Sequence, residues 1–333
     1  MGIRKLSNIG GWTSKTSYTS FLAGNPVFSL ASAYFAGGYS DASDGMKDID
    51  RILFSSDAKS ALSATLTTRR YAGGSFSNSG TAAYFCGGWQ SHPSSTAISA
   101  IDKFSFLAES ISTIAATMTS ATTSYAGASN NGTAGYAAGG YGSGGTSLNS
   151  VDKITYSNDA KSTISATLSA GQYGMGGAAN SGTAAYFAGG RDSGASRTVI
   201  DKIAFSADTK TTLSAVLSGA RISPAGFANS GTAAYFAGGD DGGGIRIDTI
   251  NKITFSSDAR SVLSATLSSV RTDAGSAANS GIAGYIAGGS NGSTFKQDID
   301  KIAFSADTKT SLAATLTLVK TGMYSAANCS ALS

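Results

Sequence analysis

The sequence has very few of the side chains that metal and acid–base chemistry require. Its 333 residues include one histidine, His92, two cysteines, Cys86 and Cys329, and a single glutamate, Glu109, among 20 acidic residues. Neither cysteine has a Cys-x-x-Cys partner, so we expect two buried, unpaired thiols. A copper site or a serine hydrolase triad would depend on His92 alone. We therefore expect no metal, no cofactor and no catalytic residue.

Charge and long hydrophobic runs are also scarce. Charged residues are 13% of the chain, against a usual quarter or so, although 41% of the residues are hydrophobic. The net charge of +4 is spread among Asp-Lys neighbours, which disfavours a nucleic-acid partner. Apolar stretches such as 233–237 are far below the roughly 18 residues that span a bilayer. The N-terminus lacks the apolar segment of a secretory signal. We expect no membrane insertion.

What the sequence does have is an internal repeat. A Gly-Gly doublet follows an apolar segment six times, at intervals of 49 to 52 residues by subtraction of residue numbers. A second marker, Ile-Asp-Lys-Ile-x-Phe or a near variant, keeps the same interval. Two markers in step predict an array of six units of about 50 residues. The doublets begin at Gly37, Gly87, Gly139, Gly189, Gly238 and Gly288.

Each unit contains four segments that are typical of short strands. In the fifth unit we expect strands at residues 226–229, 232–237, 250–255 and 263–267, with a turn at 256–260. Each segment is short. It consists of small residues, is rich in aromatic residues, or alternates apolar with polar residues, and no segment has the helical period. Four short strands per unit predict one propeller blade, and glycine and alanine suit the crowded centre of such a fold. We therefore predict an all-β, six-bladed β-propeller of four-stranded antiparallel blades.

The double glycine after an apolar strand, with an aromatic residue further along, resembles the kelch family. The resemblance covers residues 26–333 and implies a kelch-like β-propeller, commonly of six blades. The fourth strand differs, because it carries Leu and Thr where kelch repeats have Trp. In its Gly, Ser, Thr and Ala content the chain is similar to kelch-like proteins of phage tails and cyanobacteria.

Two segments lie outside this regular pattern. Residues 1–25 match no blade, and we interpret them as an N-terminal arm that binds a partner, leaving 26–333 as the propeller. Residues 324–328 repeat a first strand without the other three. Either this segment or residues 27–32 could pair with the strand that begins at Ala33 and close the ring.

Binding is expected on one face of the propeller. The turns between first and second strands and between third and fourth strands are nearly uniform along the chain. The loops between second and third strands diverge, and divergence favours a recognition surface. These loops are residues 39–48, 89–100, 141–150, 191–199, 240–249 and 290–298.

Aromatic and cationic residues of these loops and of the links between blades are the candidate site. Aromatic rings beside polar groups suit carbohydrate, although they could equally cap the bases of the loops. One position in each link is a cation in four of six units, and we expect these cations at the channel mouth, either solvated or facing an anionic ligand. The aromatic candidates are Tyr39, Trp89, Tyr141, Phe295, Tyr71 and Tyr173. The cationic candidates are Arg70, Arg221, Arg271 and Lys320.

The Asp-Lys pair of the third strand recurs in nearly every unit. A single active site does not need six copies, so we interpret these pairs as contacts between blades. Together these features predict a non-enzymatic virion protein, such as a phage tail or fibre protein, that recognises a host-surface glycan and binds other virion subunits through its arm. A scaffolding propeller that binds protein subunits and a cytoplasmic kelch-like adaptor are the alternatives.

Overall fold

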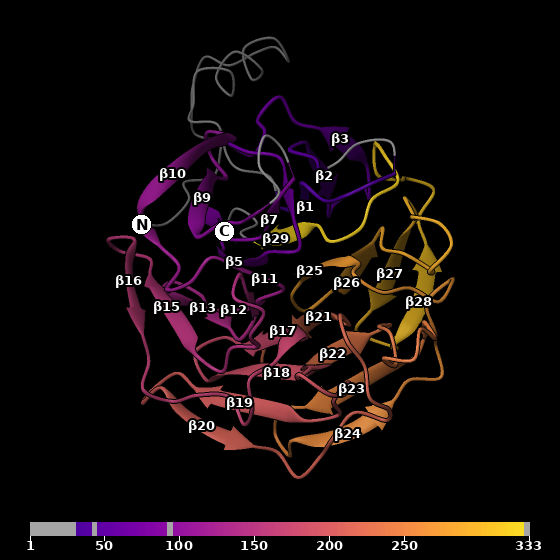
Figure 1. The fold of residues 1–333 in the computed structure, drawn as a ribbon. Helices are drawn as coiled ribbons and strands as arrows, with labels where there is room; N and C mark the ends of the chain where they lie inside the picture. The colour runs from indigo at the N-terminus through magenta and orange to yellow at the C-terminus, as the bar shows by residue number, and fades with distance from the viewer. Residues whose placement is uncertain (1–30, 42–44, 92–95, 330–333) are drawn as a thin grey trace, which may run out of the picture.

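The computed structural model describes residues 31–41, 45–91 and 96–329, and within these ranges all regular structure is β-strand. The strands form six four-stranded antiparallel sheets and two smaller ones. Figure 1 shows the larger sheets arranged around a central opening, so the fold is all-β and propeller-like. The predicted arm, residues 1–25, lies outside the described residues.

We number the four-stranded sheets 1 to 6 along the chain and give the strands of each from the centre outwards. Sheet 1 is β29 (Tyr324–Asn328), β1 (Ser32–Ala36), β2 (Ile49–Leu53) and β3 (Lys59–Ala61). Sheet 2 is β5 (Gly74–Asn78), β6 (Ala82–Cys86), β9 (Ala100–Ser105) and β10 (Ser110–Thr117). Sheet 3 is β12 (Ala126–Asn130), β13 (Ala134–Ala138), β15 (Val151–Thr155) and β16 (Ala160–Thr163).

The second half of the chain repeats this order. Sheet 4 is β17 (Tyr173–Asn180), β18 (Ala184–Arg191), β19 (Ile200–Ala204) and β20 (Thr209–Thr212). Sheet 5 is β21 (Ala225–Asn229), β22 (Ala233–Ala237), β23 (Ile250–Thr254) and β24 (Ala259–Val262). Sheet 6 is β25 (Gly275–Asn279), β26 (Ala283–Ala287), β27 (Ile299–Ala303) and β28 (Thr308–Ser311). The small sheets are β4 (Arg70–Tyr71), β7 (Trp89–Gln90) and β8 (Thr96–Ala97), and β11 (Thr122–Thr123) with β14 (Tyr141–Gly142).

The predicted strands of the fifth unit agree with sheet 5 except for the outermost one. The fourth strand was expected at residues 263–267, but β24 occupies Ala259–Val262. The turn before it is tighter than predicted, because Asp258 adopts a left-handed conformation with φ of 52°. The chain therefore reverses direction at Asp258, and β24 begins at the next residue. The amides of Leu263 and Leu267 donate hydrogen bonds to the carbonyl oxygens of Ile250 and Asp248. The predicted segment 263–267, in which apolar and polar residues alternate, is therefore an irregular extension of β24.

The question of which segment flanks the second strand of sheet 1 is answered by β29. It pairs antiparallel with β1 over its whole length, from Ser32 opposite Asn328 to Ala36 opposite Tyr324. Residues 27–30 of the competing segment lie outside the described residues. The two ends of the described chain are therefore joined in one sheet, as Figure 1 shows by the yellow β29 beside the indigo β1.

Hydrophobic clusters fill the space between neighbouring sheets. The second strands supply a buried Tyr and, in most sheets, a buried Phe, which face opposite neighbours. Tyr235 in sheet 5, for example, stacks against Phe304 of sheet 6 with ring centroids 5.2 Å apart. These aromatic side chains therefore fill the space between neighbouring sheets.

Side-chain volume is balanced across each of these interfaces. Where the inner strand carries Phe76 or Phe227, the second strand of the next sheet carries Gly135 or Gly284. A Cβ at Gly135 would lie 1.9 Å from the Phe76 ring, and one at Gly284 would lie 2.2 Å from Phe227. The other four interfaces have two alanines instead. These pairs are Ala128 with Ala185, Ala178 with Ala234, Ala277 with Ala33, and Ala326 with Ala83.

Candidate functional site

The divergent loops and the links between sheets lie at one end of the sheets, which we call the loop face. Because neighbouring strands run in opposite directions, the loops between second and third strands and the links share this end. The Gly pairs turn the chain into these loops with positive φ, for example 67° at Gly238 and 107° at Gly239. Residues 42–44 and 92–95, and with them His92, lie outside the described residues.

Three of the candidate aromatic residues meet on the loop face. The ring of Tyr39 lies 5.2 Å from that of Tyr71 and 5.7 Å from that of Phe295, between ring centroids. These residues come from the loop of sheet 1, the link between sheets 1 and 2, and the loop of sheet 6. All three are half-buried. We call them the Tyr39 cluster.

Trp89 and the remaining two tyrosines lie beside other links. Trp89 pairs with Tyr71 across the β4–β7 ladder, which puts it next to the Tyr39 cluster. Tyr141 and Tyr173 form a separate pair with ring centroids 5.0 Å apart, and Tyr141 is 40% exposed. The structure therefore divides the predicted aromatic residues into two groups rather than one continuous site.

The expectation that the four link cations lie at the channel mouth is wrong. Arg70, Arg221, Arg271 and Lys320 are each 0 or 1% exposed. Each side chain enters the interior of the next sheet rather than the solvent. Neither a solvated charge nor an anion-binding site describes these four positions.

The partners of the buried cations belong to the next sheet. Arg70 donates to the carbonyl oxygens of Gly87 at 3.3 Å and Ala100 at 3.2 Å, and its Nη2 lies 2.9 Å from Oδ2 of Asp102. Arg271 makes equivalent bonds to Gly288 and to Asp300. A buried cation is tolerated here because carboxylates and backbone carbonyls surround it.

Lys320 and Arg221 show two variations of this arrangement. Nζ of Lys320 lies 3.1 Å from Oδ2 of Asp50. Burial raises the pKa of Asp50, but the charge of Lys320 and hydrogen bonds from Thr317 outweigh it, so this pKa is lowered overall. Arg221 has Asn251 rather than an acid at the equivalent third-strand position, and it donates to the carbonyls of Gly238 and Thr249. Burial lowers its pKa to about 10.

The recurrent Asp-Lys pairs of the third strands connect neighbouring sheets, as predicted. Each Asp accepts hydrogen bonds from the segment after the fourth strand of the preceding sheet, for example Asp201 from Ser169 at 2.8 Å. Each Lys reaches an Asp in the third-to-fourth turn of the following sheet, for example Lys252 to Asp307 at 2.7 Å. At the junction of sheets 1 and 2 the pair is Arg51 with Glu109, which explains the only glutamate of the sequence as a structural residue.

The same turn aspartates bind tyrosines of the second strands. In five junctions a Tyr hydroxyl donates to the Asp of the next sheet at 2.6 to 2.9 Å. Burial, together with this hydrogen bond, raises the pKa of these phenols, to about 12 for Tyr186. They are therefore neutral hydrogen-bond donors at physiological pH.

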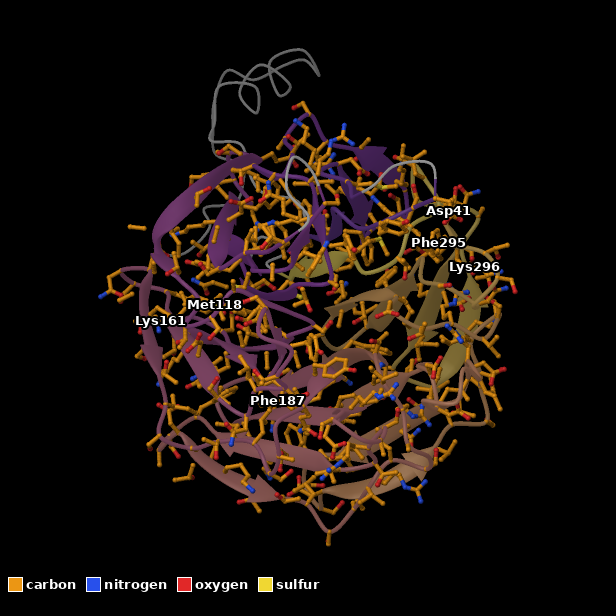
Figure 2. All side chains as sticks on the ribbon, in the orientation of Figure 1. Asp41, Met118, Lys161, Phe187, Phe295 and Lys296 are labelled. Atoms are coloured by element: carbon orange, nitrogen blue, oxygen red, sulfur yellow. The ribbon has the colours of Figure 1, made fainter. Side chains whose placement is uncertain are left out.

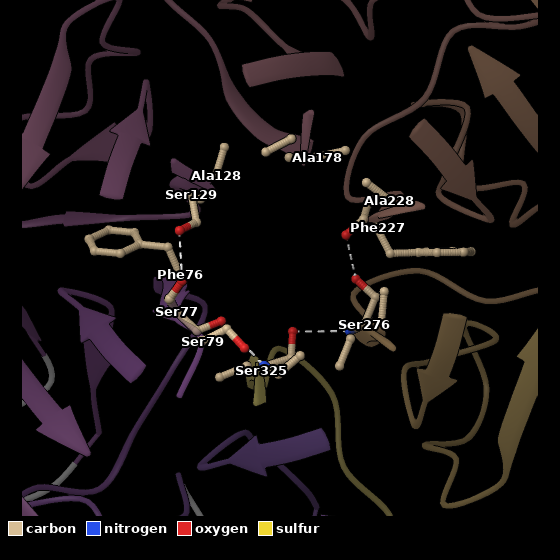
Figure 3. A pocket seen from close by; sticks show the side chains of 18 of the residues that line it. Phe76, Ser77, Ser79, Ala128, Ser129, Ala178, Phe227, Ala228, Ser276 and Ser325 are labelled. Atoms are coloured by element: carbon tan, nitrogen blue, oxygen red, sulfur yellow. Dashed lines mark hydrogen bonds between the residues drawn. The ribbon is translucent and has the colours of Figure 1, made fainter. Parts of the chain in front are cut away.

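A central channel that the sequence analysis did not consider as a site runs along the six inner strands. Its wider part is a cavity of about 450 Å³. Figure 3 shows serine hydroxyls around it, while Phe76 and Phe227 point away from the opening. Ser129 donates to the carbonyl of Ser77 at 2.6 Å, and the amide of Ser325 donates to Ser75 Oγ at 3.0 Å. The serine hydroxyls thus connect neighbouring inner strands.

Near the loop face the channel narrows at a belt of backbone hydrogen bonds. One residue of each link has positive φ, and its amide donates to the carbonyl of the equivalent residue in the preceding link, over 2.5 to 3.2 Å. The series returns to its starting residue. Its members are Ala72, Ser124, Gly174, Ser223, Asp273 and Gly322.

Within the ranges that the structure describes, no group of three or more His, Cys, Asp or Glu could hold a metal ion. The described cysteines, Cys86 and Cys329, are unpaired; Cys86 is buried, as expected, whereas Cys329 is only partly buried. In the same ranges no helix could cross a membrane.

Neither a protein-family model nor a curated protein matches this chain.

Proposed function

We propose that this chain is a closed six-bladed, kelch-like β-propeller whose loop face is a non-enzymatic carbohydrate-binding surface. The six four-stranded sheets, the β29–β1 pairing and the belt of link residues support the ring. A propeller keeps the loops of all six blades on one side, where they can be varied without changing the sheets.

The Tyr39 cluster is the observation that carries this proposal. Its three rings come from separate parts of the chain, and each keeps part of its surface exposed. Asp41 and Lys296 flank it in sequence and offer charged hydrogen-bonding groups at the same edge, as Figure 2 shows. Sugar C–H faces stack on aromatic rings, while the hydroxyl groups require such polar partners.

The burial of the link cations favours a neutral glycan. The four cations expected at the channel mouth are bonded inside the sheets and supply no positive ring at the surface. An acidic glycan would need several exposed arginines or lysines to neutralise its carboxylates, whereas the charge of Lys296 at this edge is offset by that of Asp41. The aromatic surface needs only apolar sugar faces and hydroxyl groups.

The virion setting, the anchoring role of residues 1–25 and the host-surface glycan stay predictions of the sequence. A scaffolding propeller and a cytoplasmic adaptor are the competing functions. Both would use protein partners and would bind no isolated glycan, so a direct glycan-binding measurement separates them from our proposal.

The test is a glycan array followed by affinity measurements on the bound sugars. We expect Tyr39→Ala and Phe295→Ala to weaken binding about tenfold, because an aromatic anchor commonly contributes more than 1 kcal/mol. Tyr141→Ala reports whether the Tyr141–Tyr173 pair belongs to the same site. Leu107→Ala is the control, because this exposed side chain lies in a turn at the opposite face. Binding that survives both cluster substitutions, or no binding to any glycan, would refute the proposal.

A further inference from the structure

The outermost strands of five sheets carry a cation at the same register position, and that of sheet 2 does not. In each of the five, the cation lies opposite an Ile of the third strand. In sheet 2 the equivalent residue is Ile111, which lies opposite Phe104. The outer strand of sheet 2, β10, therefore lacks the charge that the other five share. The five cations are Lys59, Lys161, Lys210, Arg260 and Lys309.

The turn that leads into β10 is changed in the same direction. Leu107 is 53% exposed and occupies the position of a serine in the other five sheets. From Ser110 to Met118 the chain has no charged residue. The outer edge of sheet 2 is thus uncharged and partly apolar. The serines that correspond to Leu107 are Ser55, Ser157, Ser206, Ser256 and Ser305.

The backbone groups of Ile111 face away from the sheet. In the five other sheets the residue three positions after the cation donates its amide to the third strand, as Leu263 does to Ile250. Because alternate residues of an antiparallel strand face its neighbour, the residue at the cation position directs its N–H and C=O outwards. No strand of the described residues pairs with the outer edge of β10, which lies at the rim in Figure 1. Ile111 therefore offers its backbone to a further strand.

A cation at this position protects an outer strand from pairing with another molecule. Lysine is a common residue on edge strands for this reason, because pairing would desolvate its charge. When two copies of one strand pair about a two-fold axis, residues near the axis lie opposite or diagonal to their own copies, so a cation there would also meet a like charge. Ile111 causes no such repulsion. A second copy of β10, which is equally uncharged, therefore suits this edge.

We propose that two copies of this chain associate by antiparallel pairing of their β10 strands, with Ile111 near the two-fold axis. The regular part of β10 is short, because its register shifts between Thr113 and Thr117. The dimer is therefore weak and dissociates on dilution. Antiparallel pairing directs the loop faces of the two copies to opposite sides, so the association is independent of the proposed glycan site.

Sedimentation velocity of the full chain over a wide range of concentrations tests this association. We expect a reversible monomer–dimer equilibrium that Ile111→Lys weakens at least about tenfold, because two lysines would then lie close together across the axis. This variant should fold, because four of the other sheets carry lysine at the same position. Ser157→Lys is the matched control, because it adds the same charge in an exposed turn of sheet 3 and should leave the equilibrium unchanged.

Two further measurements do not depend on an added charge. Ile111→Pro removes the outward N–H while the bonds of the neighbouring residues to β9 remain, so it should also weaken the dimer. In hydrogen exchange, the amides of Ile111 and Thr113 should exchange more slowly in concentrated than in dilute protein. A chain that stays monomeric at every concentration, a dimer that Ile111→Lys leaves intact, an equal loss in Ser157→Lys, or exchange that is independent of concentration would each overturn the proposal.

Discussion

At the scale of single residues, the same charged side chain has a different role depending on which sheet receives it. Arg271 and Lys320 look in the sequence like surface cations of a link, yet both are buried against acids of the following sheet. Lys252 and Lys301 lie in regular strands and keep about a quarter of their side-chain surface exposed. Burial, rather than residue type, decides how much each pair contributes to stability.

The sequence could identify the recurring cation position but not its burial. The partner of Arg70 is Asp102, in the next repeat, and a pattern read along one repeat does not show a contact that crosses to another. The aromatic candidates were found because each lies in a divergent loop or in a link between units. The division of these aromatic residues into two groups depends on the backbone path of the links, which the sequence pattern does not specify.

The belt residue Asp273 provides a prediction with a definite dependence on pH. Burial raises its pKa, although hydrogen bonds from Ser223 and Thr272 and the charge of Arg246 act in the opposite direction. A carboxyl group with a higher pKa in the folded state destabilises the protein most above that pKa, and the effect disappears as the pH falls to the unfolded value. Asp273→Asn should therefore be more stable than the natural protein at pH 8 and should lose this advantage toward pH 4. Asparagine also tolerates the φ of 54° at this position.

Urea denaturation at several pH values measures this difference, and Asp50→Asn is the matched control. The pKa of Asp50 is lowered, since the charge of Lys320 and bonds from Thr317 outweigh burial. Its carboxylate contributes stability above the unfolded pKa, and this contribution is lost as the pH falls through the folded pKa. Asp50→Asn should thus be less stable at pH 8. An Asp273→Asn protein that is also less stable at pH 8 would contradict the assignment.

At the scale of elements, the contact between an inner strand and the next second strand accepts either one large and one small residue or two small ones. Phe76 with Gly135 and Phe227 with Gly284 represent the first arrangement, and pairs of alanines represent the second. This exchange is visible in the sequence once the repeats are aligned, because Gly replaces the second residue of the Ala-Ala-Tyr segment one repeat after each Phe. The strand periods were predictable, whereas the position of β24 was not, because one left-handed residue, Asp258, shortened its turn.

The two interface arrangements, Phe opposite Gly or two alanines, predict a compensating pair of substitutions. Gly135→Ala alone should destabilise the protein by about 1–3 kcal/mol, because its Cβ would meet the Phe76 ring. Phe76→Ala alone should cost about 3–5 kcal/mol through the cavity that it leaves. The double variant reproduces the two-alanine arrangement of four other interfaces and should be more stable than Phe76→Ala. A double-mutant cycle from urea denaturation measures the coupling energy, and additive losses would contradict this account of the interface.

At the scale of the whole molecule, the first and last parts of the described chain depend on each other. β29 supplies the inner strand of sheet 1, Tyr324 donates a hydrogen bond to the carbonyl of Gly87, and Ser325 bonds to Ser75. The repeat spacing made six four-stranded sheets predictable. The partner of β1 was left undecided between two segments, because both carry residues that suit a strand and only the three-dimensional arrangement separates them.

Deletion of residues 324–333 tests this dependence directly. It removes the buried Tyr324 and Ala326 and leaves one edge of β1 without its partner. We expect a loss of about 5 kcal/mol or more, a melting temperature lower by about 10 °C, and self-association through the open edge in size-exclusion chromatography. A protein that ends at Cys329 is the control, because it keeps β29. A synthetic peptide of residues 324–329 should bind the shortened chain by strand addition and restore its melting temperature in proportion to occupancy. If the shortened chain is as stable as the control and remains monomeric, β29 does not stabilise sheet 1, because the loss of a paired inner strand should lower the stability and expose an edge of β1.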